Sequence, residues 1–141
     1  MLIGEYYHNI DAKGRVIIPA KFREDLGDSF VVSKGSNSCI NIYSAAEWQA
    51  FRIELLALRT PEASKLRHFF FSSAAPVELD AQGRILIPPT FREHAKLSKD
   101  LAIIGVSNHA EIWDKERWNA YISDPFFSSE EITRAMENLG F

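Results

Sequence analysis

The fold of this chain is decided by a stretch that occurs twice: Asp-Ala-Lys-Gly-Arg-Val-Ile-Ile-Pro-Ala-Lys-Phe-Arg-Glu at residues 11–24 and Asp-Ala-Gln-Gly-Arg-Ile-Leu-Ile-Pro-Pro-Thr-Phe-Arg-Glu at residues 80–93. Nine of the fourteen positions are identical, whereas unrelated segments of ordinary composition would share about one. With one residue inserted in the second copy, the similarity continues as far as Trp48 and Trp118 and beyond. An internal repeat of this kind indicates two related structural units.

Each copy predicts the same order of secondary-structure elements. A strand enters an Asp-x-x-Gly-Arg turn, and a strand rich in β-branched residues leaves it. Pro19 and Pro88 end this second strand, because proline cannot donate to a strand ladder but suits the first turn of a helix. A short helix and a two-stranded hairpin complete the copy. The expected ranges are 15–18, 21–26, 30–33 and 40–43 in the first copy, and 84–87, 92–97, 101–104 and 110–113 in the second.

The segment between the copies is predicted to be helical. Ser44 and Glu47 have the spacing of a capping box, and an apolar stripe follows them as far as Leu58. Pro61 ends or restarts this helix, and residues 62–71 continue in helical pattern. The aromatic run Phe69-Phe70-Phe71 could stack on single-stranded bases. Its place on a helical stripe favours contacts in the core or between subunits.

Two helices are expected after the second copy. Asp114 is placed to cap a helix that runs through Tyr121, and Ser128 or Ser129 is placed to cap the last helix. The last helix is apolar along one side, at Ile132, Met136 and Leu139. We therefore expect it to pack on the rest of its own chain or on a neighbouring subunit.

One copy has too few strands to close a hydrophobic core, so the two copies are expected to combine. We predict a mainly β fold with helices outside it, built as a pseudo-symmetric barrel or an interlocked sheet. The expected divisions are a first half at residues 5–48, a helical linker at 49–74, a second half at 75–119 and a helical tail at 120–141. Because the linker is not a Gly/Ser tether, we expect one compact unit.

Composition and charge narrow the class of protein. Cys39 is the only cysteine, so no internal disulfide can form, and we expect it to be a small buried hydrophobic residue. The chain shows neither a long apolar run nor a signal-peptide pattern, so we expect a soluble cytoplasmic protein. The net charge of −3 resides in residues 114–141, while residues 11–24 carry +2. The mean charge therefore neither forbids nor predicts DNA binding, which a local basic face can support.

The repeated turn is the candidate functional element. Gly14 and Gly83 are expected to adopt positive φ, and Asp11 and Asp80 are expected to accept backbone N–H bonds within the turn. Asp and Gly therefore shape the turn.

The arginine that follows each glycine has two interpretations. Arg15 and Arg84 could form an ion pair with the aspartate of the same turn, or they could present a guanidinium to phosphate or to guanine O6 and N7. The candidate DNA-contacting set is Lys13, Gly14, Arg15, Lys21, Arg23, Gln82 and Arg84. Gln82 replaces Lys13 without charge, so the first half should supply most of the electrostatic attraction. For Lys21 and Arg23, exposed surface charge and phosphate contact remain equal alternatives.

The two motifs at this spacing closely resemble those of the bacterial MraZ family, over nearly the whole chain. The resemblance implies two SpoVT-AbrB-type domains, whose paired hairpins interlock into a swapped-hairpin, double-psi-like barrel. It further implies a nucleoid-associated transcription factor that forms a ring. Members of that family bind tandem repeats upstream of the division and peptidoglycan operon and generally repress it. The turn residues of the family correspond here to residues 13–15 and 82–84.

Other classes of function fit the sequence less well. The four histidines show no metal-ligand spacing, and no phosphate loop or nucleophile elbow occurs, so neither an enzyme, a cofactor nor a small-molecule substrate is expected. Asp11 and Asp80 could form a carboxylate pair, but each precedes an arginine that would keep it ionised. Two alternatives stay open: a ring-forming protein-interaction scaffold and an antitoxin-like AbrB module. A salt-dependent shift of upstream DNA would distinguish the regulator from the scaffold.

Overall fold

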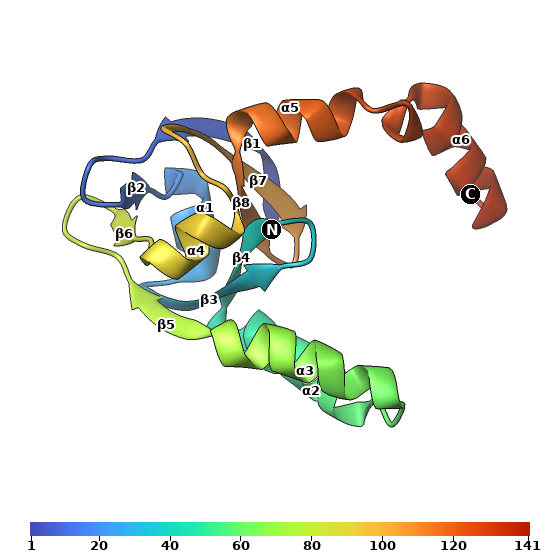
Figure 1. Cartoon of the computed structure of the whole chain (residues 1–141), viewed down its shortest axis with the longest axis horizontal. Coiled ribbons are helices and arrows are strands. Elements are labelled where there is room, and N and C mark those ends of the chain that lie inside the picture. The colour runs from blue at the N-terminus through green and yellow to red at the C-terminus, as the bar shows by residue number, and fades with distance from the viewer.

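The computed structural model describes all 141 residues and has mixed α and β structure (Figure 1). Its elements are β1 (Leu2–Asn9), β2 (Arg15–Ile17), α1 (Ala20–Leu26), β3 (Ser29–Gly35), β4 (Cys39–Ser44), α2 (Ala45–Ala57), α3 (Pro61–Ser73), β5 (Ala75–Glu78), β6 (Arg84–Leu86), α4 (Pro89–His94), β7 (Asp100–Ser107), β8 (Ala110–Asp114), α5 (Lys115–Ser123), the 3₁₀ turn η1 (Pro125–Phe127) and α6 (Ser129–Asn138). The predicted mainly β fold with helices is confirmed at this level.

The two copies of the repeat are interleaved in one antiparallel sheet. Its strand order is β1-β7-β8-β4-β3-β5, and a separate ribbon pairs β2 with β6. Strand β1 of the first copy pairs along its whole length with β7 of the second, while β5, which enters the second turn, pairs with β3 of the first. Each entering strand therefore lies on the hairpin of the other copy. The two predicted hairpins, β3–β4 and β7–β8, are confirmed.

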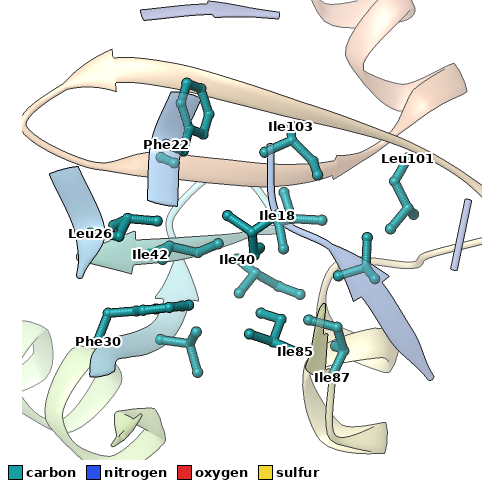
Figure 2. Close-up of a cluster of buried hydrophobic side chains, with 14 of the residues drawn as sticks. Ile18, Phe22, Leu26, Phe30, Ile40, Ile42, Ile85, Ile87, Leu101 and Ile103 are labelled. Carbon is teal, nitrogen blue, oxygen red and sulfur yellow. The ribbon is translucent and has the colours of Figure 1, made fainter. Parts of the chain in front are cut away.

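The main hydrophobic core joins both copies (Figure 2). Ile18 and Phe22 of the first copy and Ile85 and Ile87 of the second are buried in the same cluster of 17 residues. A second cluster lies on another part of the sheet and contains Cys39, Ala102, Ile104, Trp113 and Trp118. Cys39 is buried as predicted, and burial raises the pKa of its thiol to about 12. Neither copy closes a core alone.

Helix boundaries follow local capping chemistry. Ser44, Asp114 and Ser128 cap α2, α5 and α6, each accepting a backbone N–H bond three residues further on. The helix predicted over residues 92–97 lies earlier in the chain, because α4 begins at Pro89 and ends at His94. Tandem prolines start it early, with Pro89 in its first turn, and Lys96 adopts a φ of 53°, which a right-handed helix cannot contain.

Two helical arms leave the β-rich body (Figure 1). In the first, α2 and α3 pack through aromatic contacts of Trp48 with Phe71 and Phe51 with Phe70, so the phenylalanine run is engaged within the chain. The second arm consists of α5, η1 and α6 and extends to the upper right in Figure 1, above the α2–α3 arm. None of the helices is both long and apolar enough to cross a membrane. The apolar side of α6 is exposed, so of the two predicted alternatives the structure does not show packing on its own chain, and packing on a neighbouring subunit stays a prediction.

Candidate nucleic-acid interface

The two turns have the same internal hydrogen bonds. In the first, Asp11 Oδ1 accepts from the N–H groups of Lys13 and Arg15, both at 2.9 Å. In the second, Asp80 Oδ1 accepts from Gln82 and Arg84, also at 2.9 Å. Backbone bonds between the first and fifth residues close both turns. The predicted role of the aspartates in shaping the turn is confirmed.

A glycine is required at the fourth position of each turn. Gly14 and Gly83 adopt φ values of 84° and 76°, which L side chains rarely adopt. This backbone lets the following arginine turn back over the aspartate that shapes the turn.

Each aspartate also binds the arginine of its own turn. Arg15 Nε donates to Asp11 Oδ2 at 2.7 Å, and Arg84 Nε donates to Asp80 Oδ2 at 2.9 Å. The pKa of both carboxyls is lowered, chiefly by the backbone N–H bond from the arginine and also by its side chain. The two carboxylates are thus held in separate ion pairs, each with the arginine of its own turn.

The ion pairs leave part of each guanidinium accessible. The carboxylate engages the Nε edge, and the side chains of Arg15 and Arg84 remain 34% and 25% exposed. The ion-pair interpretation is therefore confirmed for both arginines, and presentation to DNA stays a prediction that their partial exposure permits. The aspartate fixes the direction of the guanidinium.

The ribbon of β2 and β6 joins the two turns. Gly14 O accepts from Ile87 N at 2.7 Å, and Gly83 O accepts from Ile18 N at 3.0 Å, which extends the ladder at both ends. Both turns lie at one end of the molecule, at the left of Figure 1, while both helical arms extend to the right. The turns therefore form an end surface that the arms leave uncovered.

An arginine from each short helix packs against the turn of the other copy. A Cβ placed on Gly83 would lie 2.3 Å from Arg23 Nη1, and one placed on Gly14 would lie 3.1 Å from Arg92 Cζ. Arg23 is anchored by its Nε bond to Ile18 O at 2.9 Å. Arg92 Nε is buried and has no hydrogen-bond partner within the chain. The first turn thus gathers Lys13, Arg15 and Arg92, and the second gathers Gln82, Arg84 and Arg23.

Two placements differ from what the sequence suggested. Arg23 stands beside the second turn, although it belongs to the first copy. Arg92 was not predicted as a site residue, although its position in the repeat matches that of Arg23 and could have indicated it. Lys21 is exposed and lines a hollow with Met1 and with Ile3 and Tyr6 of β1. It is not brought together with the turn arginines by any contact.

The fold and this surface define a class of protein: a duplicated β-rich fold that presents two arginine-bearing turns at one end. The matching family is described as "MraZ protein, putative antitoxin-like", and the match covers residues 1–68 and 70–138. This chain belongs to the MraZ family.

Curated relatives are similar over their full length. The chain is 50% identical to a protein of Thermoanaerobacter sp. (strain X514), over 99% of both chains. It is 49% identical to one of Acetivibrio thermocellus and 46% identical to one of Halothermothrix orenii, again over 99% of both chains. Each of these three relatives is named transcriptional regulator MraZ.

Proposed function

We propose that this chain is a sequence-specific DNA-binding transcriptional regulator, and that it represses the division and cell-wall operon. The observation that carries the proposal is the end surface on which both Asp-x-x-Gly-Arg turns hold pre-oriented arginines. The names of the relatives support a regulator of transcription. Exchange of the entering strands between copies supports the swapped-hairpin barrel. Double-stranded promoter DNA in the nucleoid is the proposed partner.

The turns differ in the kind of contact that each can make. Lys13 is exposed at the tip of the first turn, next to Arg15. A flexible ammonium suits phosphate, whereas a planar guanidinium suits the O6 and N7 edge of guanine. We propose that the first turn makes both contacts, and that the second, with Gln82 at its tip, contributes mainly through Arg84 and the neighbouring Arg23.

A single copy of this surface is too small to locate a promoter. Each good base contact contributes about 1–3 kcal/mol of discrimination, against a genome of competing sites. Several copies on one assembly gain avidity. A head-to-tail ring repeats its surface by rotation in one direction, so it matches direct repeats, whereas a two-fold dimer matches palindromes. We therefore propose that the protein binds promoter repeats as a ring.

The two helical arms provide surfaces for such an assembly. One side of α6 exposes Ile132 and Met136, continued by Leu139 just after the helix, and the α2–α3 arm exposes Ile53, Leu56 and Leu66. The charges are complementary in sign: α6 carries three glutamates and one arginine, whereas residues 45–73 carry four basic and three acidic residues. Because the surfaces differ and lie on different arms, their contact is heterologous and produces either a closed ring or an open filament. We propose that α6 of one subunit packs on the α2–α3 arm of the next.

A salt titration of DNA binding tests the regulator. The probe is the DNA upstream of this chain's own gene, and the wild type should shift it with an affinity that falls steeply as salt rises. Lys13→Ala combined with Arg15→Ala should abolish the shift without changing the circular dichroism spectrum. Lys34→Gln with Lys96→Gln removes two positive charges that lie outside the turns, the ribbon and both arms, and serves as the matched control. Its binding should stay near wild type, provided that its native mass is unchanged.

The outcomes separate the remaining candidates. No shift with the wild type at any salt concentration would favour the scaffold or an antitoxin-like module. Retained promoter affinity in the Lys13/Arg15 double variant would reject the turns as the contact surface. Native mass spectrometry of the wild type and of a chain ending at Phe127 measures the number of subunits in each assembly. Loss of the last helix should lower the subunit count.

A further inference from the structure

Two exposed aliphatic side chains lie on the outer face of the β2–β6 ribbon, between the turns. Ile17 is 40% exposed and Leu86 is 58% exposed, whereas their strand neighbours Val16 and Ile85 point into the core and are 1% exposed. A ribbon with one face on a core normally turns polar residues outward. Ile17 and Leu86 belong to neither core cluster, so their aliphatic character at outward positions calls for another explanation.

The register places each aliphatic side chain beside an arginine. Arg15 is opposite Leu86, and Ile17 is opposite Arg84. Arg15 and Ile17, and likewise Arg84 and Leu86, lie two residues apart on the same strand face. The outer face is therefore a four-residue ribbon patch, in which positive and aliphatic side chains alternate both along each strand and across the two strands. It consists of Arg15, Ile17, Arg84 and Leu86. An occupant must offer negative and apolar groups at similar spacing.

We infer that this ribbon patch reads bases in the major groove of DNA, and that Ile17 and Leu86 contact thymine methyl groups. The inference rests on the proposed function, because the patch is continuous with the turns that are proposed to bind DNA. The major groove admits a two-stranded β-ribbon, and its walls display guanine O6 and N7, thymine methyl groups and flanking phosphates. These are the groups that the alternation of arginine and aliphatic side chains can recognise together.

Phosphate contacts and methyl contacts have different measurable effects on DNA binding. Phosphate contacts from Lys13 and the arginines raise affinity for every sequence and set the slope with salt. Apolar contacts from Ile17 and Leu86 involve no counterion, so they alter the preference between sequences and leave the slope unchanged. The two contributions can therefore be separated in one protein.

The test combines a protein variant with a DNA variant. Ile17→Ala/Leu86→Ala and the wild type are titrated with the upstream duplex and with the same duplex in which deoxyuridine replaces every thymidine, which removes only the methyl groups. The wild type should bind the uracil duplex about tenfold more weakly. The double variant should bind the thymine duplex about tenfold more weakly than the wild type, and should lose little more on the uracil duplex. Val106→Ala, at a 42% exposed position of β7 outside the turns, the ribbon and both arms, is the matched control and should keep the wild-type preference.

Several results would overturn the inference. Equal binding of both duplexes by the wild type would exclude methyl contacts while leaving the turns as a DNA-binding surface. An unchanged preference for the thymine duplex in the double variant would place the methyl contacts elsewhere. A changed subunit mass with unaltered DNA affinity would assign the patch to a protein partner. Failure of the wild type to bind any DNA would reject the proposed function itself, and the inference with it.

Discussion

The two turns of this protein share one backbone but differ in the side chains that it presents. Residues 11–15 and 80–84 have the same carboxylate cap, the same closing bonds and a positive-φ glycine at the same position. In the first turn, Lys13 extends into solvent and Arg15 uses only its Nε edge inside the turn. In the second, Arg84 also donates from Nη2 to Gln82 Oε1 at 3.2 Å. The second turn satisfies more of its own polar groups.

This difference shows how a duplicated scaffold can specialise. The aspartate and glycine preserve the shape of each turn, because both are needed for the local hydrogen bonds and the positive φ. The tip position is free of these constraints and can change from lysine to glutamine without altering the backbone. We expect the first turn to dominate DNA affinity and the second to contribute mainly orientation.

The largest expected effect is a loss of promoter affinity, which should be greater for substitution of Arg15 than for substitution of Arg84. Arg15→Ala should weaken promoter binding about a hundredfold and Arg84→Ala about tenfold, because one good contact contributes roughly 1–3 kcal/mol and Arg84 is less exposed. Fluorescence anisotropy at a fixed salt concentration measures both. Arg15→Lys keeps the charge but lacks the planar fork, so it should recover only part of the loss. An equal or larger loss with Arg84→Ala would reverse the proposed ranking.

The next effect concerns the glycines. Gly14→Ala and Gly83→Ala should each lower the free energy of unfolding by about 1–2 kcal/mol, because both residues hold positive φ. At Gly83 the new Cβ also collides with Arg23 Nη1. Urea denaturation measures each loss.

Repeating Gly83→Ala in an Arg23→Ala background isolates the collision. The additional loss at Gly83 should shrink there, since the guanidinium that the Cβ displaces is gone. If Gly83→Ala lowers the free energy of unfolding equally in both backgrounds, backbone strain alone causes the loss.

A smaller effect follows from exchanging the tips. Lys13→Gln should reduce the slope of log affinity against log salt by about one for each first turn that touches phosphate, and Gln82→Lys should raise it if the second turn also lies near DNA. The two variants differ from wild type by a single charge at equivalent backbone positions. An unchanged slope with Gln82→Lys would place the second tip away from the phosphates.

The local features of the turns could be predicted from the sequence, whereas the partners of the arginines could not. Asp11 and Gly14 act within four residues of themselves, so turn chemistry alone was sufficient to predict their roles. Arg23 reaches the second turn only because β2 pairs with β6, which lies far along the chain. A repeat indicates that two copies exist, but it does not indicate that the entering strand of each lies on the hairpin of the other. The end surface depends on that exchange.

The smallest expected effect is the response of the turns to acid. The pKa of Asp11 and of Asp80 is lowered by the same causes in the same order, led by the backbone N–H bond of the following arginine. A carboxyl whose pKa is lower when folded contributes stability above its ordinary pKa of about 4. That contribution disappears as the pH falls through the lowered value. Asp11→Asn and Asp80→Asn should therefore be less stable than wild type at pH 7, and the gap should close below about pH 4.

The two asparagine variants also test whether the turns are electrostatically equivalent. Asparagine keeps an oxygen for the backbone N–H groups but loses the charge that holds the arginine, so each variant removes the ion pair and preserves much of the turn. Urea denaturation from pH 7 to pH 3 should show both gaps closing over the same interval, because the hydrogen bonds match. The stability difference between wild type and Asp11→Asn could persist to lower pH than the difference for Asp80→Asn. That result would show that the charge of Lys13 lowers the pKa of Asp11 further. The tip would then influence the scaffold as well as the DNA.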